Sequence, residues 1–214
     1  AFVLGSLYLK SKRLELAKKV YQGILTLFPD SISAQLGLAT AELEQSEAQP
    51  EIAKLHDYLL KCQSTEDWIA FGEFCLQFGC LDLAEKAFKV IIELDPEHYN
   101  ARLYLALIYQ ENNQIEQAVE GLRALIATYP EQGAAYTQLA NLGMLFGNFS
   151  EAELLFRHLI EKGEADWYTH YGLGVALSGQ EKFDEAEASL FQAQKQAPGR
   201  LEPNGLLQLI AEAK

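Results

Sequence analysis

The sequence repeats itself every 34 residues, and this period constrains the fold more than any other feature. Periods of roughly 20–50 residues mark arrays in which each repeat is one small supersecondary unit. Three series of residues keep this spacing: the alanines Ala84, Ala118, Ala152 and Ala186, the large residues Phe71, Leu105, Leu139 and Leu173, and the small residues Gly72, Ala106, Ala140 and Gly174.

Within one period the apolar residues have helical spacing. Leu105, Ala106 and Tyr109 share one face of a predicted helix over 101–111, and a polar turn follows at 112–114. The second half of the period has apolar residues at i, i+4 and i+7 and ends in a proline, which cannot continue a helix. These residues are Ala118, Leu122, Leu125 and Pro130. The sequence therefore predicts two helices per repeat.

The small residues predict close contact between the two helices of each hairpin. Large residues at other positions then fill the space between successive hairpins; they are Tyr21, Phe88, Tyr109 and Phe156. A single hairpin cannot bury this surface, whereas a stack of hairpins can. The sequence therefore predicts an all-α array.

Two segments carry a resemblance to a known family. The pattern Leu105-Ala106-x2-Tyr109…Ala118-x3-Leu122…Pro130 resembles the tetratricopeptide repeat (TPR), and Trp68-x2-Phe71-Gly72…Ala84-x3-Phe88…Pro96 resembles it more closely. The resemblance implies a right-handed superhelical array, an α-solenoid of helix-turn-helix hairpins. The predicted organisation is an array over 1–200 and a C-terminal capping helix over 201–214, with repeats at 1–31, 32–64, 65–98, 99–132, 133–166 and 167–200.

The repeat over 32–64 is degenerate. Pro50 lies at the predicted start of its second helix and the 34-residue spacing is not maintained, although Ala53 still occupies the position of the repeated alanine. Ser150 is a predicted N-cap of a second helix. The capping helix has Pro203 in its first turn. Its predicted apolar stripe is Leu206, Leu209, Ile210 and Ala213.

Composition restricts the partners and the compartment. The net charge of −13 opposes binding to nucleic acid and to anionic lipid, and no apolar run is long enough for membrane insertion. Cys62, Cys75 and Cys80 are too few for a disulfide framework, so we expect free thiols and a cytoplasmic protein. The sequence begins at Ala1 without an initiator methionine, so a periplasmic or membrane-anchored location stays open.

Catalytic and metal-binding patterns are absent from the sequence. The histidines His56, His98, His158 and His170 lack zinc-site spacing, and no Gly-x-Ser-x-Gly elbow occurs. The glycines at 172–174 lack the spacing of a phosphate loop, and the repeat explains Gly174. We therefore predict a protein that is not an enzyme and has no cofactor and no metal.

The resemblance implies that the first helices line an inner groove. Two interpretations compete for the stripe next to the packing face: contact between first helices, or a groove for a partner peptide or amphipathic helix. The stripe contains no Lys or Arg, whereas family members that hold the acidic C-terminus of heat-shock chaperones use such residues, which argues against that role. The predicted contact residues are Ile69, Leu76, Asn100, Leu103, Leu107, Asn141, Met144 and Tyr171.

The predicted function is a non-catalytic scaffold or adaptor that binds a protein partner in this groove. One alternative is a chaperone or assembly factor of a bacterial secretion or pilus system, which has a similar architecture. A second alternative is a TPR regulatory domain excised from a larger enzyme. A homo-oligomer formed through the N-terminal repeat is a further prediction, because the first hairpin has no predicted cap.

Overall fold

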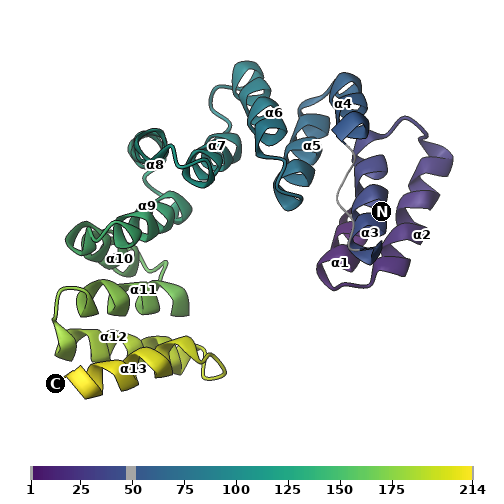
Figure 1. The fold of residues 1–214 in the computed structure, drawn as a ribbon. Helices are drawn as coiled ribbons and strands as arrows, with labels where there is room; N and C mark the ends of the chain where they lie inside the picture. The colour runs from purple at the N-terminus through teal and green to yellow at the C-terminus, as the bar shows by residue number, and fades with distance from the viewer. Residues whose placement is uncertain (1, 47–51, 214) are drawn as a thin grey trace. The chain divides into compact units, whose positions relative to one another are not determined.

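A computed structural model of the chain describes residues 2–46 and 52–213 (Figure 1). The secondary structure of these described residues is α-helical throughout, in thirteen helices, which confirms the predicted all-α fold class. The chain divides into two compact units, 1–114 and 115–214. The division falls inside the predicted repeat 99–132, so the two helices of that repeat belong to different units.

The first unit contains two complete hairpins, the degenerate repeat and one further first helix. Most neighbouring helices pack together, most extensively α2 with α3 and α5 with α6, and α3 also packs on α5. Its helices are α1 (Phe2–Lys10), α2 (Leu14–Leu27), α3 (Ile32–Ser46), α4 (Ile52–Lys61), α5 (Thr65–Gln77), α6 (Leu81–Leu94) and α7 (Tyr99–Glu111).

The second unit contains one second helix, two complete hairpins and the C-terminal helix. Figure 1 shows α11, α12 and α13 lying side by side, and the helices α10 and α11 also pack together. Its helices are α8 (Ile115–Thr128), α9 (Gly133–Leu145), α10 (Phe149–Glu161), α11 (Trp167–Ser178), α12 (Phe183–Gln196) and α13 (Glu202–Ala213).

The repeated residues form the cores of both units. The repeated alanines of the second helices are fully buried, since Ala17, Ala84, Ala118, Ala152 and Ala186 are all 0 % exposed. Four large residues were predicted to fill the space between hairpins. Of these, Tyr21, Phe88 and Phe156 are also buried, whereas Tyr109 is half-buried. Side chains of these types at this period therefore bury the apolar surface that a single hairpin would expose.

Aromatic rings of the second helices pack tightly against glycines of the first helices. A Cβ atom added to Gly72 would lie 2.8 Å from the Phe88 ring within the same hairpin. The Tyr21 ring lies between Gly5 of its own hairpin and Gly37 of the next one, at 2.7 and 2.3 Å from such added atoms. A side chain added to any of these glycines would force the ring to shift.

Some predicted details are wrong. Ser150 is not the N-cap of α10: Asn148 holds that place without a side-chain cap, and the Ser150 hydroxyl donates to Gln180 at 3.2 Å. In α13, Ile210 is buried as expected, but Leu209 is 62 % exposed because α12 faces another side of the helix. Ala213 is also exposed, whereas Leu206 packs against the core as expected and Leu207, which was not predicted, does so too. Pro50 and the side chain of Ala53 lie outside the described residues.

Candidate functional site

The predicted contact residues of the first unit lie on the first helices α5 and α7. Ile69 and Leu76 are half-buried and pack against the core that Phe71 and Phe88 form. Leu103 and Leu107 are half-buried, and Asn100 is exposed. Each apolar residue of this group therefore combines partial packing with partial access to solvent, as both interpretations of the stripe require.

A polar bridge joins the first helices of the first unit. The Tyr104 hydroxyl of α7 donates to the Glu73 carboxylate of α5 at 3.4 Å. Burial of the phenol raises the pKa of Tyr104, and the nearby charge of Glu73 raises it further. Tyr104 was not among the predicted contact residues. Its ring also lies 4.9 Å from that of Phe88.

The predicted contact residues of the second unit are brought together on α9 and α11. Met144 and Tyr171 are half-buried and pack against the core of the unit. Asn141 is bridged to the neighbouring helix, because the Tyr168 hydroxyl donates to its Oδ1 atom at 3.1 Å. The structure therefore places Asn141, Met144 and Tyr171 on adjoining first helices of one unit.

Three aromatic rings cluster at the start of α11. The ring centroid of Trp167 lies 5.6 Å from that of Tyr168 and 6.3 Å from that of Tyr171. The Arg200 guanidinium, from the segment between α12 and α13, lies 4.6 Å above the Trp167 ring. A cation at this distance is attracted by the negative face of the ring. A positive charge thus lies beside a stripe that itself contains no Lys or Arg.

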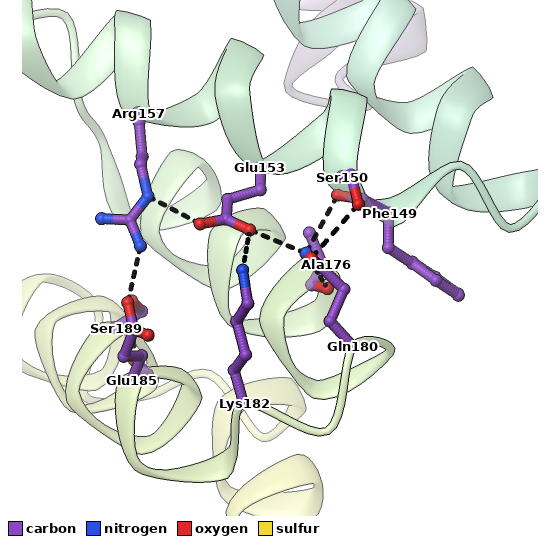
Figure 2. A network of polar contacts seen from close by, with 9 residues as sticks. All are labelled: Phe149, Ser150, Glu153, Arg157, Ala176, Gln180, Lys182, Glu185 and Ser189. Atoms are coloured by element: carbon purple, nitrogen blue, oxygen red, sulfur yellow. Dashed lines mark hydrogen bonds and ion pairs between the residues drawn. The ribbon is translucent and has the colours of Figure 1, made fainter.

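A polar network on the second helices holds successive hairpins of the second unit together (Figure 2). The Glu153 carboxylate of α10 accepts from Arg157 of the same helix at 2.9 Å and from Lys182 at 2.8 Å. Gln180 donates to the same carboxylate at 2.8 Å. Arg157 also donates to Glu185 of α12 at 2.7 Å. The network therefore ties α10 to α12 and to the turn that precedes it.

The environment of Glu153 stabilises its charged form. Burial of the side chain would by itself raise the pKa of the carboxyl group, since only 12 % of the side chain is exposed. Hydrogen bonds from Lys182, Gln180 and Arg157 outweigh this effect and lower the pKa from its ordinary 4.5 to about 2. A lowered folded-state pKa stabilises the fold above the ordinary value, and this stability is lost as the pH falls toward 2.

We expect Glu153→Gln to lower stability by up to about 3 kcal/mol at neutral pH, because lowering the pKa of Glu153 from 4.5 to about 2 corresponds to roughly that free energy. The deficit should shrink as the pH falls from about 4.5 toward 2. Thermal melts of both proteins across this pH range measure it. Glu120→Gln, at an exposed position of α8, is the matched control. A deficit that does not change with pH would contradict the assignment.

Part of this network has a signal in the 34-residue period that the predicted site residues do not include. Arg123 pairs with Glu151 at 2.8 Å between α8 and α10, as Arg157 pairs with Glu185 between α10 and α12. Both members of the pair recur after 34 residues. Opposite charges that recur 34 residues apart indicate the Arg–Glu pair. No residue that recurs at this spacing indicates Gln180 or Lys182.

The described helices give further information on membranes and metals. None of them combines the length and the apolar character needed to cross a membrane. Within residues 2–46 and 52–213, no group of three or more His, Cys, Asp and Glu side chains is arranged to hold a metal ion.

Cys75 is buried, and burial raises the pKa of its thiol to about 12, with smaller contributions from Cys80 and Cys62. The Cys75 thiol is therefore a protonated core group.

Family models match most of the chain. Residues 35–151, more than half of the chain, match the model described as the Cilia and flagella-associated protein 70 middle TPR-like domain. Residues 1–31 and 146–200 match two models of the tetratricopeptide repeat. The first of these ranges is the predicted first repeat.

A curated relative matches over most of the chain. The Arabidopsis thaliana protein described as Protein CTR9 homolog is 23 % identical over 192 residues, which cover 85 % of this chain. The chain spans only 17 % of the length of that relative.

Solved structures of similar fold come from several bacteria. A tetratricopeptide repeat protein from Parabacteroides merdae has a TM-score of 0.69 and 20 % identity over 98 % of this chain and 82 % of its own. A thermophilic TPR protein from Thermus thermophilus has a TM-score of 0.62 and 16 % identity over 98 % and 96 %. MamA from Desulfovibrio magneticus has a TM-score of 0.63 and 14 % identity over 68 % and 82 %. Together with the matches to the family models, these structures show that the chain belongs to the tetratricopeptide repeat family, whose proteins are in general protein-interaction scaffolds.

Proposed function

We propose that the chain is a non-catalytic adaptor that binds a segment of a partner protein along the first helices of its repeats. The observation that carries this proposal is the half-buried surface on α9 and α11, here called the α9–α11 surface. It consists of Thr137, Asn141, Met144, Tyr168, Tyr171 and Val175. None of its side chains carries a formal charge at neutral pH, and accessible aromatic and methionine side chains are typical anchors of interface cores.

The chemistry of this surface fits a peptide backbone or one face of an amphipathic helix. Asn141 uses its Oδ1 atom to accept from Tyr168, which leaves its Nδ2 group to donate to a carbonyl oxygen of a partner. Met144 and Tyr171 offer apolar contact on the same surface. We infer that a bound segment places apolar side chains on Met144 and Tyr171 and a backbone carbonyl on Asn141.

A photo-crosslinking amino acid tests the proposed surface. Placed at position 171, p-benzoylphenylalanine keeps an aromatic ring there, and we expect it to crosslink a partner protein from lysate of the source organism. The same group at position 154 is the matched control, because Leu154 is 68 % exposed on the second helix α10. Both proteins should melt at the wild-type temperature. Crosslinks of equal yield at the two positions, or at position 154 alone, would contradict the proposal.

The remaining sequence-based hypotheses stay predictions. They are a chaperone or assembly factor of a bacterial secretion or pilus system, a regulatory domain of a larger enzyme, a cytoplasmic location, and a homo-oligomer through the N-terminal repeat. A partner crosslinked at position 171 would distinguish the first two by its identity. Light scattering of the chain at increasing concentration tests the last.

A further inference from the structure

The first helices of the two units differ in charge. The α9–α11 surface of the second unit has no charged side chain, whereas α5 of the first unit carries acidic side chains and no basic one. Two of these acidic residues, Glu66 and Glu73, are exposed. They lie on the same side of α5 as Ile69 and Leu76, because the four residues follow at i, i+3, i+7 and i+10. The apolar stripe of α5 therefore alternates with exposed negative charge.

The Glu73 carboxylate lies among apolar side chains of two helices. It accepts a hydrogen bond from Tyr104 of α7 at 3.4 Å, and Leu107 lies one turn further along α7 than Tyr104. On α5, Ile69 lies one turn before Glu73 and Leu76 one turn after it. These three apolar side chains are half-buried. A partner that covers them would therefore also contact the carboxylate.

No cation neutralises this negative charge. Among the described residues, neither Glu66 nor Glu73 forms an ion pair with a basic side chain. The basic residue of α7, Arg102, donates from its Nε atom to the Pro96 carbonyl oxygen at 2.6 Å. An unpaired negative charge beside apolar side chains is complementary to a partner that carries positive charge beside apolar side chains.

We propose that the first helices of the first unit bind a basic amphipathic segment of a partner protein. The surface, here called the α5–α7 surface, consists of Glu66, Ile69, Glu73, Leu76, Leu103 and Leu107. Apolar side chains of the segment cover the isoleucine and the leucines, and a Lys or Arg beside them pairs with Glu73. The apolar surroundings exclude water from this pair and so strengthen its attraction. This assignment rests on the proposed function, because it gives the chemistry of a partner bound along the first helices.

A library of random peptides displayed on phage tests the chemistry of the partner. The library is selected on the full wild-type chain, and peptides that also bind Glu66→Lys/Glu73→Lys are removed. We expect the remaining peptides to carry Lys or Arg next to apolar residues. Remaining peptides that are neutral or acidic would overturn the proposal, and so would a selection that yields no peptide dependent on the two glutamates.

Single substitutions locate the charge that the selected peptide recognises. Glu73→Gln keeps an oxygen atom that accepts from Tyr104 and removes the negative charge. We expect it to weaken binding in fluorescence anisotropy by about threefold or more, and Glu73→Lys by about tenfold or more, with both effects shrinking as salt is added. Glu93→Lys, at an exposed position of the second helix α6, is the matched control. Equal effects at positions 73 and 93 would overturn the proposal, because the net charge of the chain would then explain the binding.

Two further outcomes separate this proposal from the proposed function and from self-association. If position 171 crosslinks a partner while no basic peptide depends on Glu73, the adaptor function stands and the basic segment is wrong. If basic peptides depend on Glu73 while position 171 crosslinks nothing, the α5–α7 surface is supported and the α9–α11 surface is wrong. A dimer in light scattering that Glu73→Lys dissociates would overturn the proposal, because a second copy would then occupy the surface.

Discussion

Ala186→Arg is expected to unfold the second unit at room temperature. Ala186 is 0 % exposed and lies where α12 is in close contact with Gly174 of α11. A Cβ atom on Gly174 of α11 would already lie 3.4 Å from the Ala186 carbonyl oxygen and 2.7 Å from the Leu190 side chain. Overpacking costs about 1–3 kcal/mol, and an unpaired buried charge costs about 3–5 kcal/mol. Their sum is comparable to the whole stability of a typical domain, about 5–15 kcal/mol.

An exposed alanine of the same helix supplies the control for this prediction. Ala188→Arg adds the same side chain two residues further along α12, where it points to solvent. We expect circular dichroism to show a wild-type melt for Ala188→Arg and a loss of helicity for Ala186→Arg. If Ala186→Arg melted within a few degrees of the wild type, the close contact between α11 and α12 would be wrong.

The 34-residue period was sufficient to predict the helices and much of the core. An alanine that recurs in phase with an aromatic four residues later is explained only by a repeated close contact. Ala84 with Phe88 and Ala152 with Phe156 are fully or almost fully buried, as that interpretation requires. These contacts are made within a hairpin or between neighbouring hairpins, so a local pattern contains the information that specifies them.

Other features depend on neighbours that the period does not specify. Leu7 and Leu142 have the same type of side chain, yet Leu7 is 59 % exposed and Leu142 is buried, so the residue type alone does not specify burial. The placement of Arg200 over Trp167 depends on the course of the segment between α12 and α13. Leu207 packs against the core and Leu209 is exposed, because α12 contacts only one side of α13. The spacing of the apolar residues in α13 is compatible with more than one contact side, so it does not predict which leucine is buried.

The residues of the candidate contact surface stay a prediction, because they follow from the assumed phase of the helices alone. Consecutive residues of a helix are rotated by ~100° from one another. The residues of a stripe can therefore be identified only if the side of the helix that packs against the core is known. The Leu103 side chain was predicted, whereas the adjacent Tyr104 forms the bridge to α5. In the second unit, the predicted contact residue Asn141 is joined to Tyr168 by a hydrogen bond.

Phe156→Ala is expected to destabilise the second unit by about 3–5 kcal/mol. The Phe156 ring is 0 % exposed, and it lies against Gly172 of α11. Truncation removes the burial of the ring and leaves a cavity between two hairpins. Thermal or denaturant melts of the full chain measure the loss. A loss below about 1 kcal/mol would show that the ring does not hold the two hairpins together.

The partner residue of this contact provides a sharper test. A Cβ atom on Gly172 would lie 2.3 Å from the ring, so Gly172→Ala alone should cost about 1–3 kcal/mol, in spite of the roughly 1 kcal/mol that alanine gains over glycine in a helix. With Phe156→Ala present, the new methyl group enters the vacated space, and Gly172→Ala should become neutral or stabilising. Gly205→Ala in α13, where a Cβ atom meets nothing within 4 Å, should stabilise both backgrounds equally. If the stability losses of Phe156→Ala and Gly172→Ala were additive in the double variant, the contact between the Phe156 ring and Gly172 would be contradicted. Only residues in contact couple by more than about 0.5 kcal/mol.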